Sequence, residues 1–187
     1  MRKAICFGLS FAFLLSIGAT RGSSADLSEL IERAGKGEAE AQYGLAEMYR
    51  KGEGVPKNTA DAAQWYRRAA EQGAGDAQSA LGKMYRDGEG VPKNDAEAAK
   101  WFRKAAEQDV VEAQTNLGLM NANGQGVPRD YAEAVKWYKK AAEQGDEKAA
   151  HGLGIMYHNG FGVERDDGEA RKWFRNAAEK GYYGKPR

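Results

Sequence analysis

The chain has 187 residues, and its 42% hydrophobic and 29% charged residues are the mixture of a globular domain rather than of a disordered chain. Its 28 basic and 27 acidic residues give a formal net charge of +1, which argues against a nucleic-acid partner. Cys6 is the single cysteine, so neither an intramolecular disulfide nor a thiolate metal cluster is available.

The N-terminal segment has the pattern of a secretory signal peptide. Arg2 and Lys3 precede the uncharged apolar stretch Ala4–Gly18, which is shorter than the about 20 residues that a membrane-spanning helix needs. We expect residues 1–25 to form the signal, with cleavage after Ala25; cleavage after Ala19 and an uncleaved anchor are the alternatives. The mature chain would lack cysteine and a membrane span and carry a formal charge of −2, because three basic residues and no acid are removed. We therefore expect an exported protein, periplasmic or secreted.

The rest of the chain consists of a repeat of 36 residues that aligns without insertions. Every copy has the same residues at equivalent positions, namely Leu, Met, two Gly, Val, Trp and an Ala-Ala-Glu motif. Chance cannot produce this agreement. A half-repeat precedes the array and a short tail follows it. The predicted divisions are 26–40 for the half-repeat helix, 41–76, 77–112, 113–148 and 149–184 for the repeats, and 185–187 for the tail.

Each copy is predicted to form two helices. In the first copy, Ala41, Leu45 and Met48 lie on one helix face, and Gly52 follows where a left-handed turn favours glycine. Asn58 and its equivalents are expected to cap the second helix, which buries the Trp-Tyr or Trp-Phe pair and the Ala pair. A single hairpin cannot bury both faces, so the copies are expected to stack into an all-α solenoid of nine helices, counting the half-repeat as one.

The repeated motif resembles the Sel1-like repeat, a relative of the tetratricopeptide repeat. In the second copy the resemblance is carried by Ala77, Leu81, Gly82, Met84, Tyr85, Gly88, Gly90, Val91, Pro92, Ala98, Trp101, Phe102, Ala105, Ala106 and Glu107. The resemblance implies a right-handed superhelix that acts as an adaptor, often in bacterial envelopes and signalling. Cysteine-rich members carry a β-lactamase or penicillin-binding label, but the repeats here contain no cysteine. The fourth copy departs from the motif at Glu164 and Gly168.

Residues that could carry chemistry are poorly placed for it. The Gly-x-Gly-Val-Pro segments lie between predicted helices and not after a strand, so we interpret them as turns and not as phosphate loops. His151 and His158 are two helical turns apart, about 10.5 Å, which is too far for both to bind one metal ion, and we interpret them as solvated surface residues. Ser79 lies two repeats from His151, so a catalytic triad is not expected. We therefore predict no enzyme activity, no metal and no cofactor.

The surface offers a candidate for partner binding. The residues at the first-helix positions expected to lie opposite the core differ in every copy, although the core residues barely change. This variation is typical of a surface that binds a partner, and neutral drift of a surface without a function is the alternative. The resemblance places this face on the concave side of the superhelix. The candidate partner-binding residues are Tyr43, Glu47, Arg50, Ser79, Lys83, Arg86, Thr115, Leu119, His151, Ile155 and His158, with Ala122 at the remaining equivalent position.

The candidate site becomes more apolar toward the C-terminus. Glu47 and Lys83 are replaced by Leu119 and Ile155 at equivalent positions, Asn121 replaces a Tyr, and Phe161 replaces a turn Glu. We therefore expect partner binding to concentrate in the C-terminal half, where an exposed apolar pair has a polar rim.

The predicted function is that of a non-enzymatic adaptor of the bacterial envelope that binds a protein or peptide. A periplasmic β-lactamase-like or cell-wall-ligand-binding protein is the alternative. The array is expected to end at the fourth copy, because Arg171 stands where the other copies have Ala or Val. Tyr182 and Tyr183 would either fold back over the last helices or contact another subunit.

Overall fold

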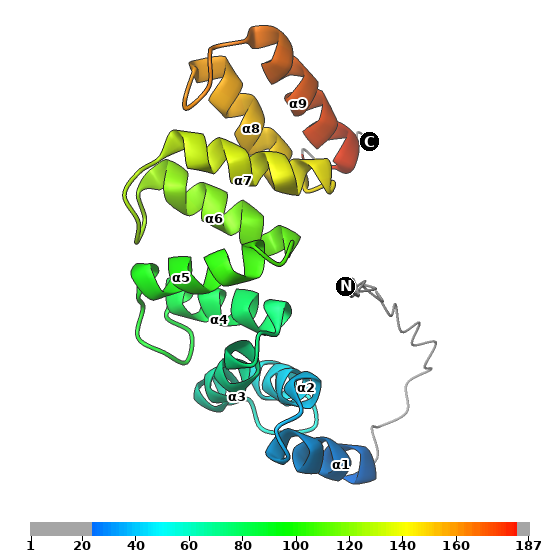
Figure 1. Ribbon diagram of the computed structural model, residues 1–187. Coiled ribbons are helices and arrows are strands. Elements are labelled where there is room, and N and C mark those ends of the chain that lie inside the picture. Colours follow the sequence, from blue (N-terminus) through cyan, green and yellow to red (C-terminus); the bar gives the residue numbers. More distant parts are fainter. Residues whose placement is uncertain (1–23, 183–187) are drawn as a thin grey trace, which may run out of the picture.

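The computed structural model describes residues 24–182, in which all regular secondary structure is helical, as predicted (Figure 1). The predicted signal segment up to residue 23, together with Tyr183 and the tail, lies outside the described residues. Nine helices are present in the described range: α1 (Ser24–Gly35), α2 (Ala39–Lys51), α3 (Thr59–Glu71), α4 (Gly75–Asp87), α5 (Asp95–Ala106), α6 (Val111–Asn123), α7 (Tyr131–Glu143), α8 (Glu147–Asn159) and α9 (Asp167–Lys180). Within this range, no helix has both the length and the apolar character needed to cross a membrane.

The predicted caps fix where the helices begin and end. A side-chain oxygen of Asn58, Asn94, Asp130 or Asp166 accepts a backbone N–H bond at the start of α3, α5, α7 or α9. Each of α2, α4, α6 and α8 ends at a glycine in the left-handed conformation, with φ of +78° at Gly52. The sequence pattern therefore sets the helix boundaries locally, before any tertiary contact is considered.

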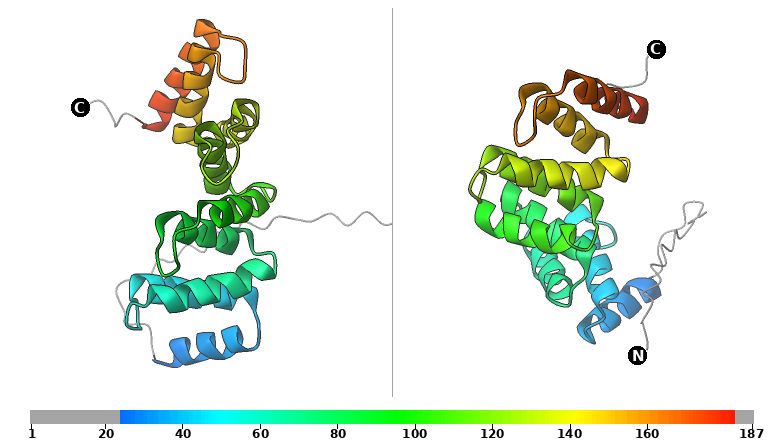
Figure 2. Two further views of the ribbon diagram at one scale, coloured as in Figure 1. Left: turned by 90° about the vertical axis from the view of Figure 1, so that its left-hand side faces the viewer. Right: turned by 45° about the horizontal axis from the view of Figure 1, so that its top comes forward.

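The helices form hairpins that stack in chain order. Each helix packs on the next one from α1 to α9. Figures 1 and 2 show a twisting stack with α1 at one end and α9 at the other. Each hairpin thus contacts only its neighbours. This architecture is the predicted α-solenoid.

The core is built from small residues packed against aromatic rings. Tyr66 and Phe102 have no exposed surface, and buried alanines surround them. A Cβ atom added to Gly82 would lie 2.9 Å from the Phe102 ring. Glycine is therefore needed at this position so that the first helix can lie flat on the ring of the second.

The tryptophans differ from the prediction that both members of the aromatic pair are buried. Trp137 is buried, but Trp65, Trp101 and Trp173 are only half-buried. The Lys104 ammonium lies over the Trp101 ring, 4.4 Å from its centroid. The second aromatic of each pair supplies the core in the first three repeats, whereas Trp65 and Trp101 lie at the edge of the core beside basic side chains.

A row of glutamines connects successive hairpins and was not predicted. Buried Gln78 donates from its Nε2 to the Ala70 carbonyl oxygen at 3.0 Å, near the end of α3. Gln108 in turn donates to Oε1 of Gln78 at 2.8 Å. The same two bonds recur one repeat earlier, at Gln42 and Gln72, and one repeat later, at Gln114 and Gln144. Each acceptor carbonyl, of Ala34, Ala70 or Ala106, also accepts a backbone N–H from the turn that follows, so the glutamine bond is a second bond at each helix end.

The C-terminal end of the stack has the polar character that was predicted. Arg171 is exposed, whereas Ala63 and Ala99 at equivalent positions are buried. Tyr182 folds back onto the same chain and stacks on His151, with ring centroids 4.3 Å apart.

Candidate functional site

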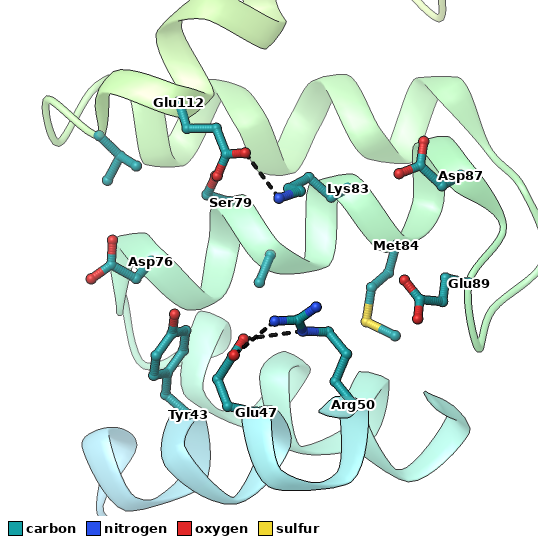
Figure 3. A pocket seen from close by; sticks show the side chains of 12 residues that line it. Tyr43, Glu47, Arg50, Asp76, Ser79, Lys83, Met84, Asp87, Glu89 and Glu112 are labelled. Atoms are coloured by element: carbon teal, nitrogen blue, oxygen red, sulfur yellow. Dashed lines mark hydrogen bonds and ion pairs between the residues drawn. The ribbon is translucent and has the colours of Figure 1, made fainter. Parts of the chain in front are cut away.

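A groove runs along the face formed by α2, α4, α6 and the start of α8, which we call the first-helix face. A pocket of about 320 Å³ lies between α2 and α4, and we call it the α2–α4 pocket (Figure 3). A second hollow of about 230 Å³ continues across α4, α6 and the start of α8. Lys83 and Glu112 line both hollows, so the two are adjacent. The candidate residues that line these hollows are Tyr43, Glu47, Arg50, Ser79, Lys83, Arg86 and Thr115, whereas Leu119, His151, Ile155 and His158 line neither.

Glu47 lies at the centre of a charged cluster on the floor of this groove. Nη2 of Arg50 donates to its carboxylate at 2.8 Å, Lys51 lies 2.9 Å away, and the buried Tyr66 hydroxyl also donates to it. Burial alone would raise the pKa of Glu47, but the hydrogen bonds from Arg50, Tyr66 and Lys51 lower it to about 2. Burial and the bond to Glu47 raise the pKa of Tyr66. The cluster is a fixed ion pair and not a proton donor or acceptor near neutral pH.

The expectation that Tyr43, Glu47 and Arg50 lie opposite the core is wrong. All three are partly buried, and the Tyr43 ring packs against the Tyr66 ring at a centroid distance of 5.6 Å. The reason is that all three contact Tyr66 of α3, whose ring packs against Tyr43 and whose hydroxyl donates to Glu47 and accepts from Arg50. These residues form the wall between neighbouring hairpins as well as a surface.

Ser79 departs most from the expected exposure. It lines the α2–α4 pocket but is only 3% exposed, and its hydroxyl has no hydrogen-bond partner. Thr115 at the equivalent position of the next repeat donates its hydroxyl to the Val111 carbonyl oxygen instead. Ser79 thus brings an unsatisfied polar group to the wall of the pocket.

Lys83 and Arg86 connect α4 to α6. The ammonium of Lys83 forms an ion pair with Glu112 at 2.9 Å, and Arg86 donates to the Asn116 side-chain oxygen and to Asp87. Arg86 holds the pKa of the Asp87 carboxyl below its usual value. Both basic side chains are therefore already neutralised within the groove.

The C-terminal half carries the exposed apolar pair that was predicted. Leu119 is 43% exposed and Ile155 is 37% exposed, values that few large apolar residues of the chain reach. Asn121 and Ala122, in contrast, are buried and do not belong to this surface. Nδ2 of Asn121 donates to the Leu117 carbonyl oxygen within its own helix, which explains why it turns inward.

The two histidines lie in different environments. His158 is exposed and its Nδ1 lies 2.8 Å from the Asp167 carboxylate. His151 is not the solvated surface residue that was expected, because its ring lies between Phe174 and Tyr182. Burial lowers the pKa of His151. In residues 24–182 no group of three or more His, Cys, Asp or Glu side chains is arranged to hold a metal ion.

The fold is that of a helical-repeat protein with hollows on its first-helix face. The Sel1 repeat model matches residues 39–73, 75–110, 111–146 and 147–182. The chain therefore belongs to the Sel1 repeat family. Proteins with this fold are typically scaffolds for protein–protein interaction and are generally non-enzymatic.

Solved structures of the same fold are similar over most of the chain. One is a protective antigen of uropathogenic Escherichia coli with an SLR fold, at 45% identity and a TM-score of 0.80, covering 83% of this chain and 33% of that one. Another is a Sel1 repeat protein from Oxalobacter formigenes, at 41% identity and a TM-score of 0.79, covering 84% and 65% respectively. This chain thus spans a third of the first relative and slightly less than two thirds of the second.

A more distant structure shares the fold. Cysteine rich protein B of Helicobacter pylori is 26% identical with a TM-score of 0.51, and the match covers 70% of this chain and 97% of that one. No curated protein matches the sequence.

Proposed function

We propose that the protein is a non-enzymatic adaptor of the bacterial envelope that binds an extended polypeptide along the first-helix face. The observation that carries this proposal is the row of two adjacent hollows, whose lining differs from repeat to repeat although the core beneath it is constant. A surface that varies while its scaffold repeats is suited to recognising one particular partner.

The apolar pair supplies the anchor for this partner. Leu119 and Ile155 occupy equivalent positions on α6 and α8, so they lie on the same face as Lys83, which lines the groove. Both side chains remain more than a third exposed in the described part of the chain. Burial of the pair by an apolar side chain of the partner would stabilise the complex by about 25 cal/mol for each Å² of apolar surface removed from water.

Site-specific photo-crosslinking in cells that produce the protein tests this proposal. A photoreactive amino acid at position 119 or 155 is expected to form a crosslink to a polypeptide, which mass spectrometry then identifies. Positions 64 and 100 on α3 and α5 serve as controls, because Gln64 and Lys100 are also exposed but lie on the second helices. Crosslinks from positions 64 and 100 without any from 119 and 155 would place the binding surface elsewhere.

Export is proposed from the sequence of residues 1–25. The apolar segment is too short to span a membrane and is followed by small residues, and the mature chain would contain no cysteine to mispair in an oxidising compartment. N-terminal sequencing of the protein from the producing cells is expected to begin at Asp26. A start at Thr20 supports the alternative cleavage site, whereas a chain that retains Met1 in the membrane fraction contradicts cleavage.

A further inference from the structure

The glutamine row that joins the earlier hairpins ends before the last one. The first three copies have glutamine at both positions of the row, whereas the fourth copy has Ala150, which is buried, and Lys180. An alanine side chain cannot donate a hydrogen bond, and Lys180 forms no hydrogen bond or ion pair in the part of the chain that the structure describes. The Ala142 carbonyl near the end of α7 therefore receives no side-chain bond of the kind that the Ala70 and Ala106 carbonyls receive.

The polar bonds between neighbouring first helices also stop at this junction. Both basic side chains that connect α4 to α6 bind polar side chains of α6. One repeat later, the equivalent residues on α6 are Leu119 and Ala122, which have neither a charge nor a side-chain donor for α8. At the Ala150 end of the junction, α7 and α8 are joined by small apolar residues such as Ala142 and Ala149.

The opposite end of the same junction carries a contact that the other copies lack. Phe161, in the turn after α8, stacks on Tyr131 at the start of α7, with ring centroids 4.7 Å apart and an interplanar angle of 10°. No other copy has aromatic residues at both positions. The close backbone approach of Gly162 to Tyr131 lies at this end too. Ala150 is in the first turn of α8 and the stack lies beyond its last residue, so about 14 Å of helix separates the two ends.

The last hairpin is also covered on one side only. Within the described range, α9 lies at the end of the stack and buries only Ala170 and Ala177, whereas α7 buries five residues (Figure 1). In a repeat protein each hairpin is held by the interface with its neighbour, so the interface with the fewest bonds opens at the lowest free energy. The junction between α7 and α8 is therefore where we expect this stack to open first.

We propose that α8 and α9 form a hinged unit, which pivots about the Tyr131–Phe161 stack and opens from α7 at the Ala150 end while α1–α7 remain stacked. The aromatic stack holds one end in place, because two rings in contact attract each other and bury apolar surface. The missing glutamine bond leaves the other end without a polar connection. Opening exposes Ala142 and Ala149, which are buried in the docked form.

The hinged unit carries one half of the exposed apolar pair. Ile155 belongs to α8 and Leu119 to α6, so the two are aligned only while the hairpin is docked. A partner that contacts both residues would hold the hairpin in the docked form, because a ligand shifts an equilibrium toward the state that it binds better. This consequence rests on the proposed function, whereas the hinge itself does not.

The rate at which a thiol reagent labels a buried cysteine measures the opening. Ala149→Cys lies at the open end, and Ala113→Cys is its equivalent at the preceding junction, where the glutamine bond is present; neither alanine has exposed surface. Mass spectrometry locates the label, so a reaction at Cys6 does not interfere. We expect position 149 to react at least about tenfold faster than position 113, because the hydrogen bonds that oppose opening are absent there. Equal rates at the two positions overturn the proposal.

A second pair of positions distinguishes pivoting from complete separation. Met156 is buried in the core that α8 shares with α7, near the hinge, and Met120 is its equivalent in the core that α6 shares with α5. Met156→Cys and Met120→Cys are expected to react at similar rates, because the aromatic stack keeps this end docked. Labelling at position 156 that is as fast as at position 149 would show that the whole hairpin separates, and it would overturn the hinge.

Two double variants test whether the glutamine pair controls the opening. Ala150→Gln with Lys180→Gln restores the pair in the fourth copy and should slow labelling at position 149 toward the rate at position 113. The reverse exchange, Gln114→Ala with Gln144→Lys, places the residues of the fourth copy in the third and should accelerate labelling at position 113. The reverse exchange needs no additional space in the core, so it remains decisive if glutamine does not fit at position 150. Unchanged labelling at position 113 in this variant overturns the assigned cause.

The labelling and the crosslinking experiments fail independently, because thiol labelling needs no partner. Faster labelling at position 149 without crosslinks from positions 119 and 155 would leave the hinge standing and remove the proposed function. Crosslinks from both positions with equal labelling rates would do the reverse.

Discussion

The backbones of Gly90 and Thr59 touch directly, although 31 positions separate them in the sequence. A Cβ atom added to Gly90 would lie 2.1 Å from the Thr59 carbonyl oxygen. Gly90 belongs to the turn after α4, and Thr59 opens α3 of the preceding hairpin. The same contact joins Gly126 to Asp95 and Gly162 to Tyr131. The second glycine of each turn is therefore needed for the docking of successive hairpins, in addition to its positive φ.

Gly90→Ala is expected to destabilise the protein more than Gly54→Ala. Both glycines are left-handed, with φ of +70° and +75°, so alanine adds about 1–2 kcal/mol of backbone strain at either position. Only Gly90 has backbone atoms of another hairpin in the way, since the nearest atom to Gly54 is the flexible Met48 methyl group. We expect the additional loss at Gly90 to be about 1–3 kcal/mol, measured by urea denaturation. Equal losses would show that the contact between hairpins relaxes freely.

Phe102→Ala should destabilise the protein more than Trp101→Ala, although tryptophan is the larger residue. Phe102 has no exposed surface and its ring lies against Gly82, so its removal leaves a cavity and should cost about 3–5 kcal/mol. Trp101 is half-buried, and water can occupy much of the space that its truncation opens. Urea denaturation of the two variants measures the difference. A larger loss for Trp101→Ala would show that the tryptophan and not the phenylalanine supports the core.

The features that could be predicted from the sequence are local or repeat with the period of 36 residues. The helix caps at Asn58 and Asn94 depend on residues two or three positions away, and the turn at Gly52 depends on its own φ. The exposure of Leu119 and Ile155 follows from the comparison of equivalent positions, because each replaces a charged residue. These features therefore need only nearby residues or a comparison of the four copies.

The features that were missed depend on side chains that reach from one hairpin to the next. Gln108 bonds to Gln78 thirty residues away, and the polar pattern on a helix does not show which side chains will meet across this distance. Ser79 is likewise buried by parts of the chain that the residue pattern of α4 alone does not reveal. Repetition of Gln at positions 42, 78 and 114 was a signal that could have predicted the glutamine row, since a polar residue retained at a core-like position indicates a hydrogen-bonding role.

Glu47→Gln is expected to reduce stability at pH 6 and to have little effect near pH 2. The folded-state pKa of about 2 lies below the ordinary value of 4.5, so folding favours the carboxylate. The resulting stability is fully present above about pH 4.5 and is lost as the pH falls toward 2. Because Arg50 and Lys51 are partly solvated, we expect a difference of about 2 kcal/mol at pH 6, measured by urea denaturation across this range. Glu53→Gln is the control, and a loss for Glu47→Gln that is the same at both pH values would contradict the assigned ion pair.

Tyr182→Ala is expected to raise the pKa of His151 toward its ordinary value of 6.5. The imidazole is tilted against Phe174, with centroids 5.4 Å apart, and stacked on Tyr182 with an interplanar angle of 16°. Burial lowers the pKa of His151 because it removes water from the charged imidazolium, so folding favours the neutral ring. The neutral ring therefore contributes stability above pH 6.5, and this contribution is lost as the pH falls. An NMR titration of the His151 ring protons measures the pKa in each variant. Tyr182→Phe retains an aromatic ring and should leave the pKa lowered. An unchanged titration in Tyr182→Ala would show that Phe174 and α8 alone cover the imidazole.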